Sequence, residues 1–94
     1  MITEKILDVF PIGKTVLSEN AQSKLDLPEL YAALDRHARG DWGEVCPDCA
    51  KANDITLDRY FRVMSAYTSS KGVKFQLITE AHRLVTLVLV SDNP

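Results

Sequence analysis

The sequence predicts an α+β fold: a short N-terminal strand or hairpin, two helices, and then a three-stranded antiparallel meander. Apolar residues recur at helical spacing in the first half of the chain and alternate with polar residues in the last third. The stretch Gly40–Gly43 joins these two parts and contains the single tryptophan. Ninety-four residues suit one small core, so we expect residues 1–94 to form a single domain.

The N-terminal part is expected to be extended before the first long helix. Alternating apolar residues over Lys5–Phe10 and β-branched residues over Lys14–Leu17 predict two short strands, with a turn at Pro11–Gly13 between them. Ser18 is suited to cap a short helical turn over Glu19–Lys24. These segments carry no motif that indicates a chemical function.

The clearest helix is predicted over Asp26–Arg39. Asp26 and Glu29 have the spacing of a capping box at its start. Gly40 is the expected end of the helix, because glycine readily takes the left-handed conformation that closes a helix. The apolar stripe of this helix is predicted to be Leu27, Leu30, Tyr31, Leu34 and Ala38.

The second helix, over Pro47–Leu57, has few apolar residues and should be more exposed than the first. Three strands follow, over Phe61–Thr68, Val73–Glu80 and Leu84–Val90. The last of them is apolar on both faces, which favours an interior position in the sheet beside an N-terminal strand. The predicted core is Leu27, Leu30, Leu34, Trp42, Val63, Phe75, Leu77, Leu87 and Leu89.

Composition argues against several classes of protein. The net charge is −2, so the basic surplus that drives most nucleic-acid binding is absent. The N-terminus lacks the regions of a signal peptide, and the longest apolar run is too short to span a bilayer. We therefore expect a cytoplasmic protein without a membrane segment. Two closely spaced cysteines make no disulfide framework, so we expect free thiols.

Four segments of the chain together resemble one family. They are Leu34–Gly43, Ala52–Asp54, Met64–Tyr67 and Lys74–Val88. They are similar to the small uncharacterised proteins of bacterial plasmids, phages and other mobile elements, which are often described as plasmid-related proteins or mislabelled as restriction-system subunits. The pairing of Arg-His-x-x-Gly-Asp-Trp-Gly with Ile-Thr-Glu-Ala-x-Arg carries the resemblance. It implies a biological setting but no activity, and the family usually has acidic residues where Cys46 and Cys49 stand.

Cys46-Pro-Asp-Cys49 is the first motif with chemical meaning. A helix N-terminus favours the thiolate form of a cysteine. The motif is similar to the glutaredoxin active site, but that site follows a strand in a thioredoxin-like fold. His37 and His82 would complete four zinc ligands, although the spacing matches no zinc motif. The sequence therefore favours two thiols at the start of an exposed helix, with no metal and no other cofactor.

A second hypothesis is a small ribonuclease, because a helical layer before an antiparallel meander resembles the barnase and RelE-like architecture. In this hypothesis His37 and Glu80 move protons. Arg83 and Lys74 hold phosphate, and Tyr67 positions a base. In the structural alternative His37 donates a hydrogen bond to the tryptophan loop, and Glu80 forms an ion pair with Arg83.

The hypothesis that we favour is a non-enzymatic accessory protein of a mobile element that binds a host or defence protein. An acidic, exposed second helix would meet a basic protein surface. The expected binding residues are Asp41, Trp42, Glu44, Asp48, Asp54 and Asp58. A ribonuclease or toxin is the alternative function, and nucleic acid is the alternative partner. The sequence leaves open whether the chain is a monomer or a homodimer.

Overall fold

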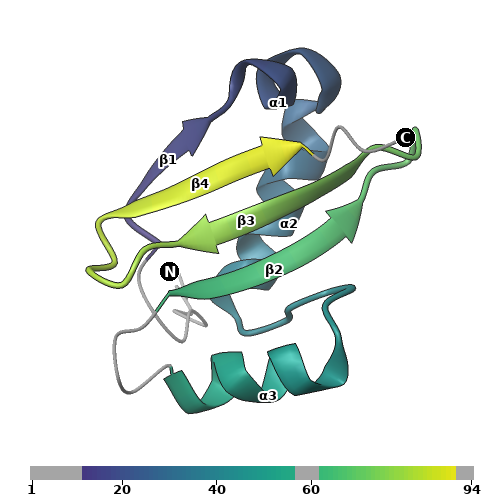
Figure 1. Ribbon diagram of the computed structural model, residues 1–94. Helices are drawn as coiled ribbons and strands as arrows, with labels where there is room; N and C mark the ends of the chain where they lie inside the picture. Colours follow the sequence, from purple (N-terminus) through teal and green to yellow (C-terminus); the bar gives the residue numbers. More distant parts are fainter. Residues whose placement is uncertain (1–11, 57–61, 91–94) are drawn as a thin grey trace, which may run out of the picture.

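The computed structural model describes residues 12–56 and 62–90 (Figure 1). Within these ranges the fold is α+β, as predicted. The elements in chain order are β1 (Lys14–Leu17), α1 (Glu19–Lys24), α2 (Leu27–Ala38), α3 (Pro47–Thr56), β2 (Val63–Thr68), β3 (Lys74–Thr79) and β4 (Val85–Val90). The strand predicted over Lys5–Phe10 lies outside the described residues.

The four strands form one sheet in the order β1-β4-β3-β2 (Figure 1). The pairs β2–β3 and β3–β4 are antiparallel, which confirms the meander. β4 lies inside the sheet, also as predicted, because β1 pairs with it in parallel and places Val16 opposite Leu87. The complete sheet is therefore mixed rather than a purely antiparallel meander. The turn predicted over Glu19–Lys24 is the helix α1, and the hydroxyl of Ser18 caps it as predicted.

The main core lies between α2 and one face of the sheet, which we call the inner face (Figure 1). Leu30, Ala33 and Leu34 of α2 are buried there against side chains from the strands. β2 and β3 alternate as the sequence predicted, with odd-numbered residues pointing inward and even-numbered residues outward. The inner-face residues of the main core are Tyr67, Phe75, Leu77 and Val88.

Three residues of the predicted α2 stripe are buried, namely Leu30, Leu34 and Ala38, and the other two were wrong. Leu27 is 56% exposed and Tyr31 is also exposed. The buried side of α2 instead runs through Leu30, Ala33, Leu34 and His37, at the spacing i, i+3, i+4 and i+7. The error has a physical cause. A polar residue, His37, occupies a fully buried position, so a stripe drawn through the apolar residues alone is rotated about the helix axis from the side that is buried.

The predicted core positions in β4 were also wrong. Leu87 is half-buried and Leu89 is exposed, whereas Thr86 and Val88 are completely buried. β4 is apolar on both faces, so its sequence does not show which face is inward. The register decides it, because Val88 lies opposite the buried Leu77, and Thr86 lies opposite Thr79.

The capping box predicted at the start of α2 does not form. Asp26 is the N-cap residue, but its side chain makes no capping hydrogen bond. Its carboxylate lies 3.6 Å from the ammonium of Lys71, and the carboxylate of Glu29 accepts a hydrogen bond from the backbone N–H of Ser70. The turn between β2 and β3 thus attracts both acidic side chains, and hydrogen bonding to Ser70 is the main cause of the lowered pKa of Glu29.

Candidate functional site

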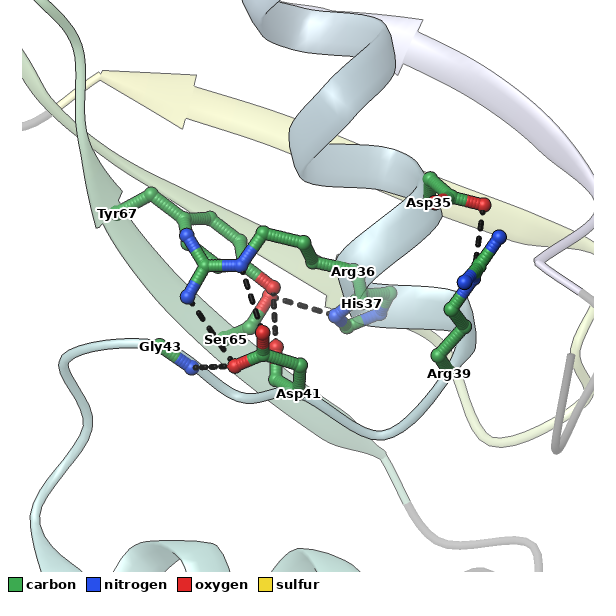
Figure 2. A network of polar contacts seen from close by, with 8 residues as sticks. All are labelled: Asp35, Arg36, His37, Arg39, Asp41, Gly43, Ser65 and Tyr67. Carbon is green, nitrogen blue, oxygen red and sulfur yellow. Dashed lines mark hydrogen bonds and ion pairs between the residues drawn. The ribbon is translucent and has the colours of Figure 1, made fainter. Parts of the chain in front are cut away.

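The loop Gly40–Gly43 is held in place by an arginine of the preceding helix (Figure 2). Arg36 donates from Nε to one carboxylate oxygen of Asp41 at 2.7 Å and from an Nη to the other at 3.2 Å. The same carboxylate accepts a hydrogen bond from the N–H of Gly43. The hydrogen bonds from Arg36 are the main cause of the lowered pKa of Asp41. Gly40 and Gly43 both have positive φ, which is why glycine stands at each end of the loop.

The same loop covers the free edge of β2. Ala66 donates its N–H to the carbonyl of Trp42 at 3.1 Å, and Glu44 donates its N–H to the carbonyl of Ala66 at 2.7 Å. Tyr67, the next residue of β2, donates its hydroxyl proton to the carbonyl of Asp41 at 2.5 Å. The backbone N–H and carbonyl of Ala66 are therefore satisfied by residues of this segment, which protects that part of the edge against pairing with another chain.

Trp42 lies inside the protein, with only 5% of its surface exposed. It packs on Val63 and makes an edge-to-face contact with His37, at 5.6 Å between ring centroids. Its indole N–H donates to the carboxylate of Asp54 in α3 at 2.9 Å. The predicted core position of Trp42 is confirmed, and a partner would reach the loop through its exposed neighbours rather than through this ring.

His37 is completely buried between two hydroxyl groups from the strands. Its Nδ1 lies 2.6 Å from Oγ of Ser65, and its Nε2 lies 2.8 Å from Oγ1 of Thr79. Burial, and secondarily the positive charge of Arg83, lower the pKa of His37 to about 4. The imidazole is therefore neutral at physiological pH.

A chain of hydroxyls fixes the proton on this imidazole. Thr86 donates to the carbonyl of Ile12 at 2.6 Å, so its proton is used there. At the 2.7 Å contact between the threonines, Thr79 must then be the donor. Thr79 in turn can only accept from Nε2 of His37, which leaves Nδ1 to accept the proton of Ser65. We assign the Nε2–H tautomer from this sequence of donors.

The five residues of the ribonuclease hypothesis do not meet at one accessible place. His37 lies in the interior close enough to Arg83 to be affected by its charge, and Arg83 itself is only 4% exposed. Tyr67 is buried and uses its hydroxyl on the loop. Glu80 forms an ion pair with Arg62 at 3.3 Å. Lys74 is exposed and follows the outward pattern of the even-numbered residues in β3. It therefore lies on the opposite face of the sheet from His37 and Tyr67.

Four of the six residues of the predicted binding surface are exposed in the structure. They are Asp41, Glu44, Asp48 and Asp54. Trp42 is buried, and Asp58 lies outside the described residues. Three of the exposed carboxylates already have partners within the chain. Asp41 binds Arg36, Glu44 accepts a hydrogen bond from the hydroxyl of Thr68, and Asp54 accepts the indole N–H of Trp42.

The expectation of free thiols was wrong, because Cys46 and Cys49 are joined in a disulfide. The two residues lie within one helical turn at the start of α3, which brings their side chains together. His82 lies in an exposed turn, where its Nδ1 accepts the N–H of Leu84. Among the described residues no group of three or more His, Cys, Asp or Glu side chains is placed to hold a metal ion.

A shallow hollow of about 170 Å³ lies between α2 and the end of β2. Its walls include Glu29, Ala33, Arg36, Tyr67 and Phe75. The guanidinium of Arg36 lies 4.6 Å from the centre of the Tyr67 ring, so the aromatic face is already occupied by a cation. The sequence pattern did not predict the contact of Arg36 with Tyr67 or the hollow beside it.

No protein-family model, curated protein or solved structure matches this chain. In the ranges 12–56 and 62–90, none of the helices has both the length and the apolar character needed to cross a membrane.

Proposed function

We propose that this protein is a non-enzymatic accessory protein of a bacterial mobile element and acts by binding a host or defence protein. One observation carries the proposal: α3, a helix of ten residues, buries only one side chain, and that side chain is the polar Asn53. A helix that buries so little apolar surface leaves most of its side chains on the surface of the protein. Its exposed surface is the best candidate for a contact with another molecule.

The outer face of α3, which we define as Asp48, Ala52 and Ile55, has the composition of a small protein contact. The spacing i, i+4 and i+7 places these residues on one side of the helix, and all three are exposed. Ile55 is 61% exposed, so this face presents a large apolar side chain to the solvent. An apolar centre beside a carboxylate suits a partner surface with an apolar pocket and a nearby cation.

The surroundings of His37, the main residue of the ribonuclease hypothesis, also support a protein without catalytic activity. Both ring nitrogens of His37 are engaged with buried hydroxyls, and its lowered pKa keeps it neutral. A general base needs to reach the proton that it removes, and a ring with no exposed surface does not reach a polynucleotide. These residues are better explained as internal supports of the tryptophan loop and the strands.

The decisive experiment is affinity capture from a bacterial lysate, followed by identification of the retained protein and measurement of its binding to the purified chain. Ile55→Glu should weaken that binding by about tenfold or more, since it places a charge at the centre of the contact. Leu84→Glu is the matched control, because Leu84 is 67% exposed and lies in the turn between β3 and β4. Equal binding by the two variants would contradict the proposed surface.

The alternative function is tested in parallel. Purified protein is incubated with total bacterial RNA, and the RNA is examined on a gel. Intact RNA is expected. Cleavage that persists after further purification and is lost on substitution of Arg83 would replace the binding proposal with a ribonuclease.

A further inference from the structure

The cysteine pair at the start of α3 is an exposed redox group that the proposed function does not use. Cys46 and Cys49 are joined in a disulfide, and both residues are exposed. Their Cα atoms are 5.1 Å apart, and the two residues are separated by three positions in the sequence. A disulfide that closes so short a loop constrains the unfolded chain little, so fold stability alone gives a weak reason for its presence.

The two sulfurs have different surroundings. Cys46 directly precedes α3, and its carbonyl accepts the N–H of Ala50 at 2.9 Å, so it occupies the N-cap position. The N–H of Cys49 points at Sγ of Cys46, at 3.1 Å. A donor aimed at that sulfur, together with the positive end of the helix dipole, stabilises a thiolate on Cys46. Cys49 lies inside the first turn and is the closing partner.

We propose that Cys46 and Cys49 form a thiol–disulfide exchange site in which Cys46 is the attacking thiolate. The substrate class is an accessible disulfide of a small molecule or of another protein. The inference is separate from the proposed binding function, because it concerns stoichiometric exchange and holds whether or not a partner is captured.

The exchange balances in two steps. In the reduced protein the Cys46 thiolate attacks the substrate disulfide R–S–S–R′, forms a Cys46–S–S–R bond and releases R′S⁻. The Cys49 thiolate then attacks Sγ of Cys46, releases RS⁻ and closes the disulfide found in the structure. Two electrons pass from the cysteines to the substrate, and the two thiol protons pass through water to the released thiolates. Two molecules of a small-molecule thiol such as glutathione return the pair to the dithiol and are themselves joined in a disulfide.

The negative charge around the cysteine pair also affects which substrate disulfides would react. Asp48 lies between the two cysteines in the sequence and is exposed, and the exposed Glu44 precedes them. These carboxylates disfavour an anionic group beside the reacting sulfurs and favour a disulfide with cationic neighbours. Asp48→Asn should therefore narrow the difference in rate between a cationic and an anionic aromatic disulfide.

The first test compares the single thiols. Cys49→Ser leaves only Cys46, and Cys46→Ser leaves only Cys49, so the two variants are matched. Each is mixed with 2,2′-dithiodipyridine, an uncharged aromatic disulfide, at pH 6, where an ordinary thiol with a pKa of about 8.5 is almost wholly protonated. Cys49→Ser should react about fivefold faster than Cys46→Ser. Equal rates, or a faster Cys46→Ser variant, would overturn the assignment of Cys46.

The second test needs no substitution. The wild-type chain is equilibrated with mixtures of reduced and oxidised glutathione, quenched with acid, alkylated and weighed by mass spectrometry. We expect the disulfide and dithiol forms to interconvert across these mixtures while the circular dichroism spectrum stays constant. A disulfide that no mixture reduces, or a dithiol that no mixture reoxidises, would overturn the proposal.

Discussion

Asn53 of α3 binds both backbone groups of Met64 in β2. Its Nδ2 donates to the carbonyl of Met64 at 2.7 Å, and its Oδ1 accepts the N–H of Met64, with 3.3 Å between nitrogen and oxygen. The side-chain amide thus takes the place that a neighbouring strand would occupy at this edge. This pair fastens α3 to the sheet, together with the contacts that Ala50 makes with the small Trp42 cluster.

Asn53→Ala should destabilise the fold by about 1–3 kcal/mol, because it leaves a partly buried N–H and carbonyl of Met64 without their partner. Asn53→Asp should cost at least as much, since a carboxylate would face the carbonyl of Met64. Urea unfolding measures both effects. Lys51→Ala, an exposed position on the same helix, is the control, and a loss of stability as large as that of Asn53→Ala would contradict this role of the amide.

Trp42→Ala should lower the free energy of unfolding by about 3–5 kcal/mol, the usual range for removing a buried aromatic side chain. The ring is buried against Val63 and His37, so its loss leaves a cavity beneath the loop. Trp42→Phe keeps most of that packing and loses the N–H that Asp54 accepts, so it should cost about 1 kcal/mol. Thermal unfolding followed by circular dichroism separates the two, and an unchanged midpoint in Trp42→Ala would exclude a structural role for the loop.

The sequence predicted the parts of the fold that depend on local pattern. Strict alternation identified the inward faces of β2 and β3, and Gly40 and Gly72 mark places where the backbone has positive φ. It did not predict the inward face of β4, because the buried side contains Thr86 and is less apolar than the side with Leu87 and Leu89. That choice depends on pairing with β3, which places Val88 opposite Leu77.

The interior role of His37 was not predicted for a related reason. Its partners, Ser65 and Thr79, lie 28 and 42 residues away, and no local spacing connects them. A weaker signal was available, because both are polar residues at inward positions of strands that are otherwise apolar. A hydroxyl at such a position needs a hydrogen-bond partner. His37 of α2 is a natural candidate for that partner.

Gly43 and Gly72 offer a matched pair for substitution by alanine. Both have positive φ, at 70° and 82°, so each alanine would carry the left-handed strain of about 1–2 kcal/mol. A Cβ on Gly72 meets no atom within 4 Å, whereas a Cβ on Gly43 would collide with the carbonyl oxygen of Ala66 and lie 2.7 Å from the Tyr67 ring. Gly43→Ala should therefore cost about 1–3 kcal/mol more than Gly72→Ala in urea unfolding. Equal costs would show that the loop has room to move away from β2.

Acidification should destabilise the protein through His37. Well above pH 6.5 the imidazole is neutral in both the folded and the unfolded chain, so it contributes no pH dependence there. Between pH 6.5 and about 4 the unfolded chain binds a proton that the folded chain does not, because burial lowers the pKa of His37 to about 4. Stability then falls with falling pH by up to about 1.4 kcal/mol per pH unit, for a total of about 3 kcal/mol, and the loss levels off below pH 4.

His37→Gln tests this origin of the pH dependence, because glutamine retains one donor and one acceptor for Thr79 and Ser65 but does not titrate. The variant should be less stable than the wild type at pH 7, since the amide does not reproduce the imidazole geometry. Its stability should change less between pH 6 and pH 4.5, so that the two curves converge. Urea unfolding at each pH gives the comparison, with His82→Gln as a control for removal of an exposed imidazole. Parallel curves for wild type and His37→Gln would mean that other groups cause the acid sensitivity.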